Sequence, residues 1–225
     1  MVFELDPDDY SFPKPALAEA DGLLAIGGDL STDRLLTAYY NGIFPWYSED
    51  TPILWYAPHE RFVLDPQEIK ISKSMSKVLR TNTFHVTYNK SFDAVIDNCS
   101  SVARVDQDGT WIVDDMKCAY KELHRLGFAH SIEVWHGEEL VGGLYGILVG
   151  KVFCGESMFA KVSNASKVAL IYLCQSFDLE LIDCQIHSEH LESMGAKTIE
   201  SSEFYAKLGQ QLYDQHGLQR LFRHP

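Results

Sequence analysis

Residues 130–159 read HSIEVWHGEELVGGLYGILVGKVFCGESMF and contain three runs of apolar and β-branched side chains. Two short turns, HGEE at 136–139 and Gly150, separate these runs. The spacing predicts three consecutive antiparallel strands. Glycines inside the second run, LVGGLYG, indicate close backbone approach or a bulge more than a phosphate-binding loop. A sheet built around these strands should therefore form the centre of the fold.

Helical patterns flank these strands on both sides in the sequence. Before them we expect a helix near residues 70–80, a strand FHVTY, a helix capped by Ser91, and an amphipathic helix DDMKCAYKELHRLG. After them we expect a helix SNASKVALIYLCQSF, a buried strand LELIDCQI and a last helix SSEFYAKLGQQL. The order predicts an α+β fold with a mixed sheet and flanking helices, an arrangement that resembles the acyl-CoA N-acetyltransferase (GNAT-like) superfamily.

One signature of that superfamily is missing. Its members have a glycine loop that opens a helix and holds the coenzyme A pyrophosphate on backbone N–H groups. The corresponding passage here, GESMFAKVSNASK, has no such loop. The scaffold therefore suggests acyl transfer to an amine from a donor other than an acyl-CoA.

The N-terminal residues predict a separate small α/β domain. GGDLSTDRLLTAYYNG should form a helix with Ser31 or Thr32 as its N-cap and Gly42 as its stop. The strand segments ILWYAP and RFVL should complete this unit, and a DP dipeptide interrupts the pattern after them. We therefore expect two domains, residues 1–64 and 65–225.

The composition is that of an ordinary globular protein: 225 residues, 46% hydrophobic and 23% charged, with a formal net charge of −13. No apolar run approaches the roughly 20 residues needed to cross a bilayer, and the N-terminus has no secretory pattern. We therefore expect a cytoplasmic protein with no membrane partner. Five widely spaced cysteines without a C-x-x-C pair indicate reduced thiols. No heptad or repeat demands a partner, so we expect a monomer.

One basic window interrupts the acidic chain. Residues 69–92 contain no Asp or Glu, and they include Lys70, Lys73, Lys77 and Arg80 at intervals of three, four and three residues. On a helix these cations would share one face. That face is either an ordinary solvated surface or a stripe that contacts nucleic-acid phosphates. Arg220 and Arg223 in the C-terminal tail are weaker candidates for the same task.

Two carboxylates lie inside otherwise apolar predicted strands. Glu156 in VFCGESMF and Asp183 in LELIDCQI must find a hydrogen-bond or cationic partner, because an unpaired buried carboxylate is costly. Each could serve only a structural hydrogen bond. Gln185 follows Asp183 by two residues, so the period of a strand should put both side chains on one face, where they could orient a nucleophile.

A rival site consists of Cys184, His187 and His190, spaced by three residues. These residue types suggest zinc or a Cys-His nucleophile. No fourth ligand is evident, and Cys184 should point away from Asp183 on the strand. We therefore expect no metal.

A series of motifs carries a family resemblance. In chain order they are DGLLAIGGDLS, GIFPW, LWYAP, GTWI, HSIEVW, LVGGLYG, FCGESMF, NASK, LIDCQ and HLESMGA. From about Phe12 to Glu200 the chain resembles the leucyl/phenylalanyl-tRNA-protein transferases. The resemblance implies an enzyme that moves Leu or Phe, less often Met, from aminoacyl-tRNA to proteins that begin with Arg or Lys, marking them for the bacterial N-degron pathway. It also implies an acetyltransferase-like C-terminal domain and no metal or coenzyme.

The resemblance further implies roles for single residues. The catalytic constellation of the family falls on Glu156, Asp183 and Gln185. Contacts to the aminoacyl group and the terminal adenosine fall on these side chains: Tyr39, Trp46, Trp111, Leu144, Met158, Leu170, Phe177 and Ile182. Leu144 and Leu173 stand where relatives can carry Met or Phe, so the preference between Leu and Phe stays open.

A mechanism follows from the chemistry of these groups. The donor ester is already activated, so the enzyme must mainly hold an amine against it. An α-amine has a reference pKa of about 7.7 to 8.0 and needs no strong base. Because a Gln amide does not usefully titrate, we expect Asp183 to polarise Gln185 and take up positive charge, while Glu156 orients the acceptor. Trp46 should stack on the adenosine or line the aminoacyl pocket.

Two alternative functions remain at this level. One is a coenzyme A-dependent N-acetyltransferase on the same fold. The other is a tRNA- or N-degron-binding module in which Glu156 and Asp183 hold a basic N-terminus without chemistry.

Overall fold

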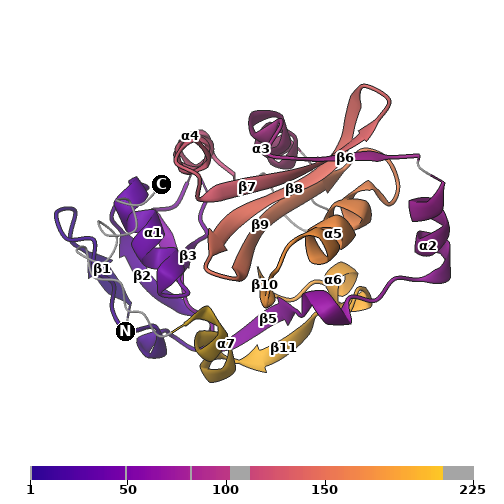
Figure 1. Cartoon of the computed structure of the whole chain (residues 1–225). Helices are drawn as coiled ribbons and strands as arrows, with labels where there is room; N and C mark the ends of the chain where they lie inside the picture. The colour runs from indigo at the N-terminus through magenta and orange to yellow at the C-terminus, as the bar shows by residue number, and fades with distance from the viewer. Residues whose placement is uncertain (1, 49, 82, 102–111, 210–225) are drawn as a thin grey trace.

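The computed structural model describes residues 2–48, 50–81, 83–101 and 112–209, and its main feature is a seven-stranded sheet (Figure 1). The strands are β5 (Glu60–Leu64), β6 (His85–Tyr88), β7 (Ala129–His136), β8 (Glu139–Val149), β9 (Val152–Ala160), β10 (Leu181–Gln185) and β11 (Lys197–Glu200). Their order is β11-β5-β10-β9-β8-β7-β6. All neighbours are antiparallel except β9 and β10, which α5 (Ala165–Ser176) connects as a parallel crossover. The expected α+β fold with a mixed sheet is confirmed.

The three expected central strands are β7, β8 and β9, and glycines of β8 allow helices to pack closely on them. A Cβ atom on Gly142 would lie 2.5 Å from the Cβ of Ala165, at the start of α5. A Cβ on the adjacent Gly143 would lie 3.3 Å from Val95 of α3 (Phe92–Ser101). Because successive strand residues face opposite sides, the two glycines serve both faces of the sheet. A bulge also interrupts β8 where it pairs with β9, as the glycine run predicted.

Helices cover both faces of the large sheet (Figure 1). α3 and α4 (Asp114–Arg125) pack on one face and α5 on the other. α2 (Lys73–Arg80) begins after Ser72, whose hydroxyl accepts a hydrogen bond from the Met75 N–H at 3.1 Å. Lys70 therefore precedes this helix instead of lying on it. α6 (Glu189–Ser193) and β11 are short elements that the sequence pattern did not predict, and α7 (Ser201–Leu208) follows them.

A second sheet is built from N-terminal residues. It contains β1 (Phe3–Leu5), β2 (Leu23–Gly27), β3 (Phe44–Pro45) and β4 (Leu54–Tyr56) in the order β1-β2-β4-β3. Helix α1 (Thr32–Tyr40) follows β2, and Gly42, with a φ of 67°, comes just after its end.

The assignment of RFVL to this N-terminal unit was wrong. These residues form β5 in the interior of the large sheet, between β11 and β10, and all four are buried, as an interior strand requires. One apolar cluster also joins Leu24 and Trp55 of the small sheet to Tyr145 and Phe159 of the large one. The two sheets therefore share a core, and a domain boundary at residue 64 stays a prediction.

The N-terminal segment is fastened by a buried arginine of α1. Arg34 donates hydrogen bonds to the backbone oxygens of Asp6, Pro7 and Asp9 at 2.9, 3.3 and 3.1 Å. Its Nε lies 3.5 Å from the carboxylate of Asp29, which is 45% exposed.

No helix in the described ranges is long and apolar enough to cross a membrane.

Candidate active site

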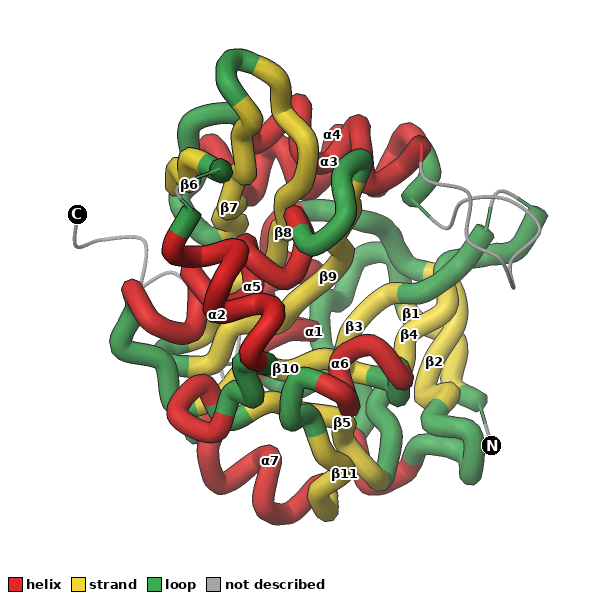
Figure 2. Tube along the Cα trace, turned by 90° about the vertical axis from the view of Figure 1, so that its right-hand side faces the viewer, coloured by secondary structure: helices red, strands yellow, loops and turns green. Residues whose placement is uncertain are grey.

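A cavity of about 770 Å³ opens where the parallel strands β9 and β10 part. The two strands pair at three positions, and the last pair joins Cys154 to Asp183. Beyond this pair, Glu156 of β9 and Gln185 of β10 line the cavity together with residues from β3, β8, α5 and the loop into α6. Figure 2 shows β3, β9, β10 and α6 gathered in the middle of this side of the molecule. The cavity thus draws on segments between Phe44 and Leu191 that lie far apart in the sequence.

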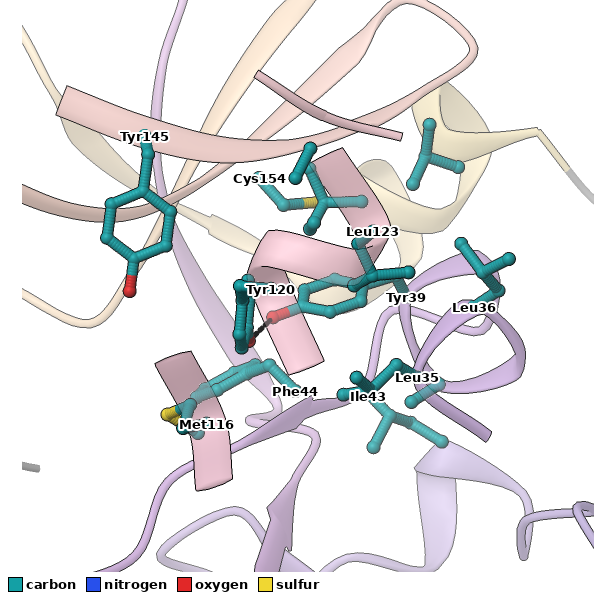
Figure 3. Close-up of a cluster of buried hydrophobic side chains, with 14 of the residues drawn as sticks. Leu35, Leu36, Tyr39, Ile43, Phe44, Met116, Tyr120, Leu123, Tyr145 and Cys154 are labelled. Carbon is teal, nitrogen blue, oxygen red and sulfur yellow. Dashed lines mark hydrogen bonds between the residues drawn. The ribbon is translucent and has the colours of Figure 1, made fainter. Parts of the chain in front are cut away.

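Glu156 lies at the centre of a buried hydrogen-bond network. The Gln185 side-chain amide donates to its Oε1 at 2.8 Å, and the Tyr120 hydroxyl donates to its Oε2 at 3.0 Å. The Tyr39 hydroxyl forms a hydrogen bond with that of Tyr120 (Figure 3). Burial raises the pKa of Glu156 to about 7, although hydrogen bonds from Tyr39, Tyr120 and Gln185 oppose this shift. A carboxyl group with such a pKa can exchange a proton near neutral pH.

The two tyrosines connect Glu156 to distant parts of the chain. Tyr39 comes from α1 and Tyr120 from α4, and both are fully buried. Burial and then the charge of Glu156 raise the pKa of each hydroxyl well above its usual range. Both side chains therefore stay neutral hydrogen-bond donors at any working pH.

Gln185 lies in a strained turn at the end of β10. Its φ is 65°, which is uncommon for a residue other than glycine. The N–H of Ile186 donates to the carbonyl of Cys184 at 2.8 Å, which closes a three-residue turn with Gln185 at its centre. Such a backbone costs on the order of 1–3 kcal/mol and persists only where its surroundings hold it. Here the Gln185 N–H donates to Oδ1 of Asp183 at 2.9 Å.

Asp183 is bound by Arg61 of β5. Arg61 Nε donates to Oδ1 at 2.8 Å and Nη2 to Oδ2 at 2.7 Å, and the exposed fractions of the two side chains are 2% and 0%. Arg61 Nη1 also donates to the Gly42 carbonyl at 2.9 Å, and the guanidinium lies 4.9 and 4.4 Å from the ring centroids of Phe44 and Phe204. Burial lowers the pKa of Arg61, but Asp183 outweighs this effect and the net pKa is raised. Arg61 therefore stays positively charged beside the Asp183 carboxyl group.

We expected the side chains of Asp183 and Gln185 to contact each other, and this expectation was wrong. The register between β10 and β5 shifts between the two residues, so the two-residue alternation of the strand stops there. The Gln185 amide consequently meets Glu156, and Asp183 reaches only the Gln185 backbone. No glycine or proline marks this bulge, so the sequence carried no signal for it.

Most of the apolar side chains expected at the substrate site do line the cavity: Trp46, Leu144, Met158, Leu170 and Ile182. Two others lie elsewhere. Tyr39 lies behind Tyr120, and Phe177 packs against Tyr88 and Tyr172 with ring centroids 4.8 and 6.3 Å apart. Trp111 lies outside the described residues.

Three further side chains line the cavity or bond to its carboxyl groups and were not predicted as site residues: Arg61, Tyr120 and Phe44. Arg61 had a partial signal, because it begins the predicted strand RFVL, and a charged residue that is buried in a strand needs a partner of opposite charge just as Asp183 does. Tyr120 and Phe44 had none, because buried aromatic residues are common in any core. Only the assembled fold brings Tyr120 to Glu156.

The basic stripe is exposed. Lys73, Lys77 and Arg80 lie on α2, Lys70 precedes it, and none of the four has an ion pair among the described residues. In Figure 1 α2 lies at the end of the molecule opposite the N-terminal sheet. Arg220 and Arg223 lie outside the described residues.

The Cys-His grouping does not form a site. Burial raises the pKa of Cys184 well above its usual range, which makes it a poor nucleophile or ligand. His187 pairs with Glu192 at 3.0 Å, and burial lowers the pKa of His190. Within the described ranges no group of three or more His, Cys, Asp or Glu residues could hold a metal ion. All five cysteines are free, as expected.

An apolar cavity that contains a carboxyl group with a pKa near 7 is typical of an enzyme site in which a proton is transferred. Comparison with known proteins narrows this class. A family model described as leucyl/phenylalanyl-tRNA protein transferase matches residues 63–209, and the model of its N-terminal domain matches residues 28–59. The chain belongs to the leucyl/phenylalanyl-tRNA protein transferase family.

Individual relatives agree with this assignment, and each is named leucyl/phenylalanyl-tRNA–protein transferase. The protein of Anaeromyxobacter sp. (strain Fw109-5) is 54% identical over 209 residues, which cover 92% of this chain and 89% of the relative. That of Syntrophobacter fumaroxidans is 53% identical over 94% of this chain and 91% of the relative. That of Flavobacterium johnsoniae is 54% identical over 89% of this chain and 96% of the relative.

Proposed function

We propose that the protein transfers leucine or phenylalanine, less often methionine, from aminoacyl-tRNA to the N-terminal Arg or Lys of acceptor proteins. The product is marked for degradation by the bacterial N-degron pathway. The hydrogen-bonded pair of Glu156 and Gln185, in the cavity of a chain from this family, carries the proposal. We further propose that the enzyme acts as a cytoplasmic monomer. The separation of β9 and β10 beyond Asp183 supports an acetyltransferase-like arrangement of the sheet.

The apolar wall of the cavity suits the aminoacyl side chain. Leu144, Leu170, Leu173 and Ile182 are buried apolar residues there, and Met158 adds an adaptable side chain. Burial of a Leu or Phe side chain in such a wall contributes roughly 1.5–3 kcal/mol to binding. This contribution selects large apolar amino acids over small or charged ones.

The proposed reaction forms one bond and breaks one. The acceptor nitrogen attacks the ester carbonyl carbon, a C–N bond forms, and the bond from that carbon to the ribose oxygen breaks. Glu156 takes a proton from the amine and returns one to the departing ribose oxygen, and its pKa of about 7 suits both steps. The Gln185 Nε2 donates to Glu156, so the Gln185 side-chain oxygen can accept a hydrogen bond from the acceptor amine.

Asp183 has a different task from the one expected from its sequence. Both of its oxygens are bound by Arg61, and Oδ1 also holds the Gln185 backbone, so it acts on the position of Gln185 and not on its amide.

The acceptor carries a positive side chain and an α-amine, and the net charge of −13 attracts both.

The transfer assay tests this function directly. The protein is incubated with Phe-tRNA carrying labelled Phe and a peptide that begins with Arg, and a peptide that begins with Ala serves as the control. We expect label in the Arg peptide and little in the Ala peptide. If both substrates bind and no label is transferred, the chain is a binding module. Acetylation of the peptide by acetyl-CoA would instead indicate an N-acetyltransferase.

Charge reversal on α2 should weaken tRNA binding. We expect the double variant Lys73→Glu, Lys77→Glu to lose about tenfold or more in affinity for aminoacyl-tRNA at moderate salt. The slope of log affinity against log salt should also become shallower, by about 0.7–0.9 for each phosphate that is no longer neutralised. The double variant Lys117→Glu, Lys121→Glu on α4 is the control. Equal affinity and equal salt slopes for the α2 variant and the wild type would reduce the stripe to a solvated surface.

Removal of the Trp46 ring should weaken the binding of aminoacyl-tRNA more than it destabilises the fold. Trp46 is half-buried, lines the cavity and contacts Tyr56 at a centroid distance of 5.8 Å. A stacked base contributes about 1–3 kcal/mol, so Trp46→Ala should raise KM for aminoacyl-tRNA roughly 5- to 150-fold. Tyr47→Ala removes a neighbouring half-buried ring that does not line the cavity, and it should leave KM unchanged. Equal KM values for both variants would contradict this role of Trp46.

A further inference from the structure

Arg61 lies where three distant segments meet. Its guanidinium binds both oxygens of Asp183 on β10, donates to the carbonyl of Gly42 after α1, and packs on the ring of Phe204 in α7. The same guanidinium faces the ring of Phe44. Arg61 does not line the cavity, so its effect on a bound substrate must pass through other residues.

Stability alone is a weak reason for such a pair. Replacement of a buried ion pair by apolar residues of similar volume is often neutral or stabilising, because desolvation offsets the attraction between the charges. What the pair does provide is a fixed orientation of the Asp183 side chain. The planar guanidinium fork binds a carboxylate through two parallel hydrogen bonds and so fixes the plane of the Asp183 carboxyl group.

The fixed carboxylate in turn holds a strained backbone. Oδ1 of Asp183 accepts the N–H of Gln185, the residue with a φ of 65° at the centre of the three-residue turn. The turn aims the Gln185 side chain at Oε1 of Glu156. An Asp183 side chain free to rotate would release this N–H, and Gln185 would then relax towards negative φ.

We propose that Arg61 is a positioning residue for the transfer reaction: through Asp183 it holds the turn at Gln185 and keeps the Gln185 amide against Glu156. This inference rests on the proposed transfer function. Arg61 also contacts the segment that leads to Trp46, because the Gly42 carbonyl and the Phe44 ring come just before that residue.

Arg61→Lys is the informative substitution. Lysine keeps the positive charge that Asp183 needs, but its single ammonium cannot reproduce the planar fork. Misplacement of a reacting group by about 1 Å can lower the rate about 100-fold, so we expect kcat to fall about 100-fold. KM for aminoacyl-tRNA should change by less than about threefold, because the apolar wall of the cavity and Trp46 are unchanged.

Arg34→Lys is the matched control. Arg34 is also a fully buried arginine with backbone-carbonyl partners, but none of its hydrogen-bond partners lines the cavity. This variant should lose thermal stability and keep its kcat once the folded fraction is taken into account. A purely structural role for Arg61 would give the same result for Arg61→Lys.

A double-mutant cycle with Gln185→Ala decides between the two roles. If Arg61 acts through Gln185, Arg61→Lys should lower kcat less than about threefold in the Gln185→Ala background, because the group it positions is gone. The same loss in both backgrounds would overturn the proposal. If Arg61→Lys does not fold, Phe204→Leu, which loosens one ring against Arg61, enters the same cycle with the same criteria. Absence of any transfer by the wild type would count against the proposed function and not against this inference.

Discussion

Glu156→Gln should lower kcat of the transfer reaction by about 100-fold or more while aminoacyl-tRNA still binds. A positioned acid–base group contributes about 10²–10⁴-fold, and glutamine cannot accept the proton of the amine. The amide has the shape of the carboxyl group, and the neighbouring Tyr120 hydroxyl and Gln185 amide can each turn to donate or accept. The active-site geometry should therefore survive, and the loss should report chemistry.

The pH profile gives a second test of the same residue. Since burial raises the pKa of Glu156 to about 7, the proton-accepting form builds up as the pH rises through 7. With saturating acceptor, kcat of the wild type should rise through this range and then level off. In Glu156→Gln that rise should disappear, whereas any rise due to the acceptor amine should remain. A variant with nearly full kcat and an unchanged profile would assign the proton to another group.

The same substitution should stabilise the protein at alkaline pH. The pKa of Glu156 is above its usual value of 4.5 in the folded state, so folding favours the protonated form. Stability therefore falls as the pH rises from about 4.5 to about 7, and the loss is complete above that range. The difference corresponds to about 3 kcal/mol, which Glu156→Gln should recover at pH 8 and not at pH 4. Denaturant unfolding at both pH values measures the free energy of unfolding of the variant and of the wild type. If the difference between the two proteins is the same at pH 4 and at pH 8, the burial effect is contradicted.

Asp183→Ala should destabilise the fold by about 3–5 kcal/mol. Both partners are buried, and removal of Asp183 leaves the Arg61 guanidinium with only the Gly42 carbonyl as a polar partner among the described residues. Turnover should also fall much further than tRNA binding, because the Gln185 turn loses its backbone acceptor. Urea unfolding gives the first quantity, and transfer and binding assays at a temperature where the variant is folded give the others.

Asp29→Ala is the control for this prediction. Asp29 lies 3.5 Å from the other buried arginine, Arg34, but is itself 45% exposed. Such a pair contributes at most about 1 kcal/mol, so its removal should change the stability little. If Asp183→Ala unfolded no more easily than Asp29→Ala, the buried pair would not be a structural anchor. If Asp183→Ala lost tRNA binding and nothing else, Asp183 would contact the RNA instead of holding the turn at Gln185.

Regular elements were predictable because local patterns determine them. The meander of β7, β8 and β9 follows from alternating runs and glycine turns, and α4 and α5 follow from apolar periodicity. RFVL was assigned to the wrong sheet because the strands that pair with it come from a distant part of the sequence. β5 pairs with β10 and β11, both more than 100 residues later.

The residue types of the site were visible in the sequence, but their contacts were not. Carboxylates in apolar strands must have partners, so Glu156 and Asp183 stood out without any structure. Which partner each one takes depends on geometry. The bulge after Asp183 turns Gln185 to Glu156, and the position of β5 brings Arg61 to Asp183.

The sequence by itself thus determined the α+β class, the meander, the family and the list of polar residues that needed partners, because these depend on local pattern and residue chemistry. The tertiary structure alone decided that Arg61 neutralises Asp183, that Tyr120 and Gln185 hold Glu156, and that Phe177 lies away from the cavity. The physical reason is that pairing between buried polar groups depends on distance and direction in space. These are properties of the packed chain, and no local pattern of residues encodes them.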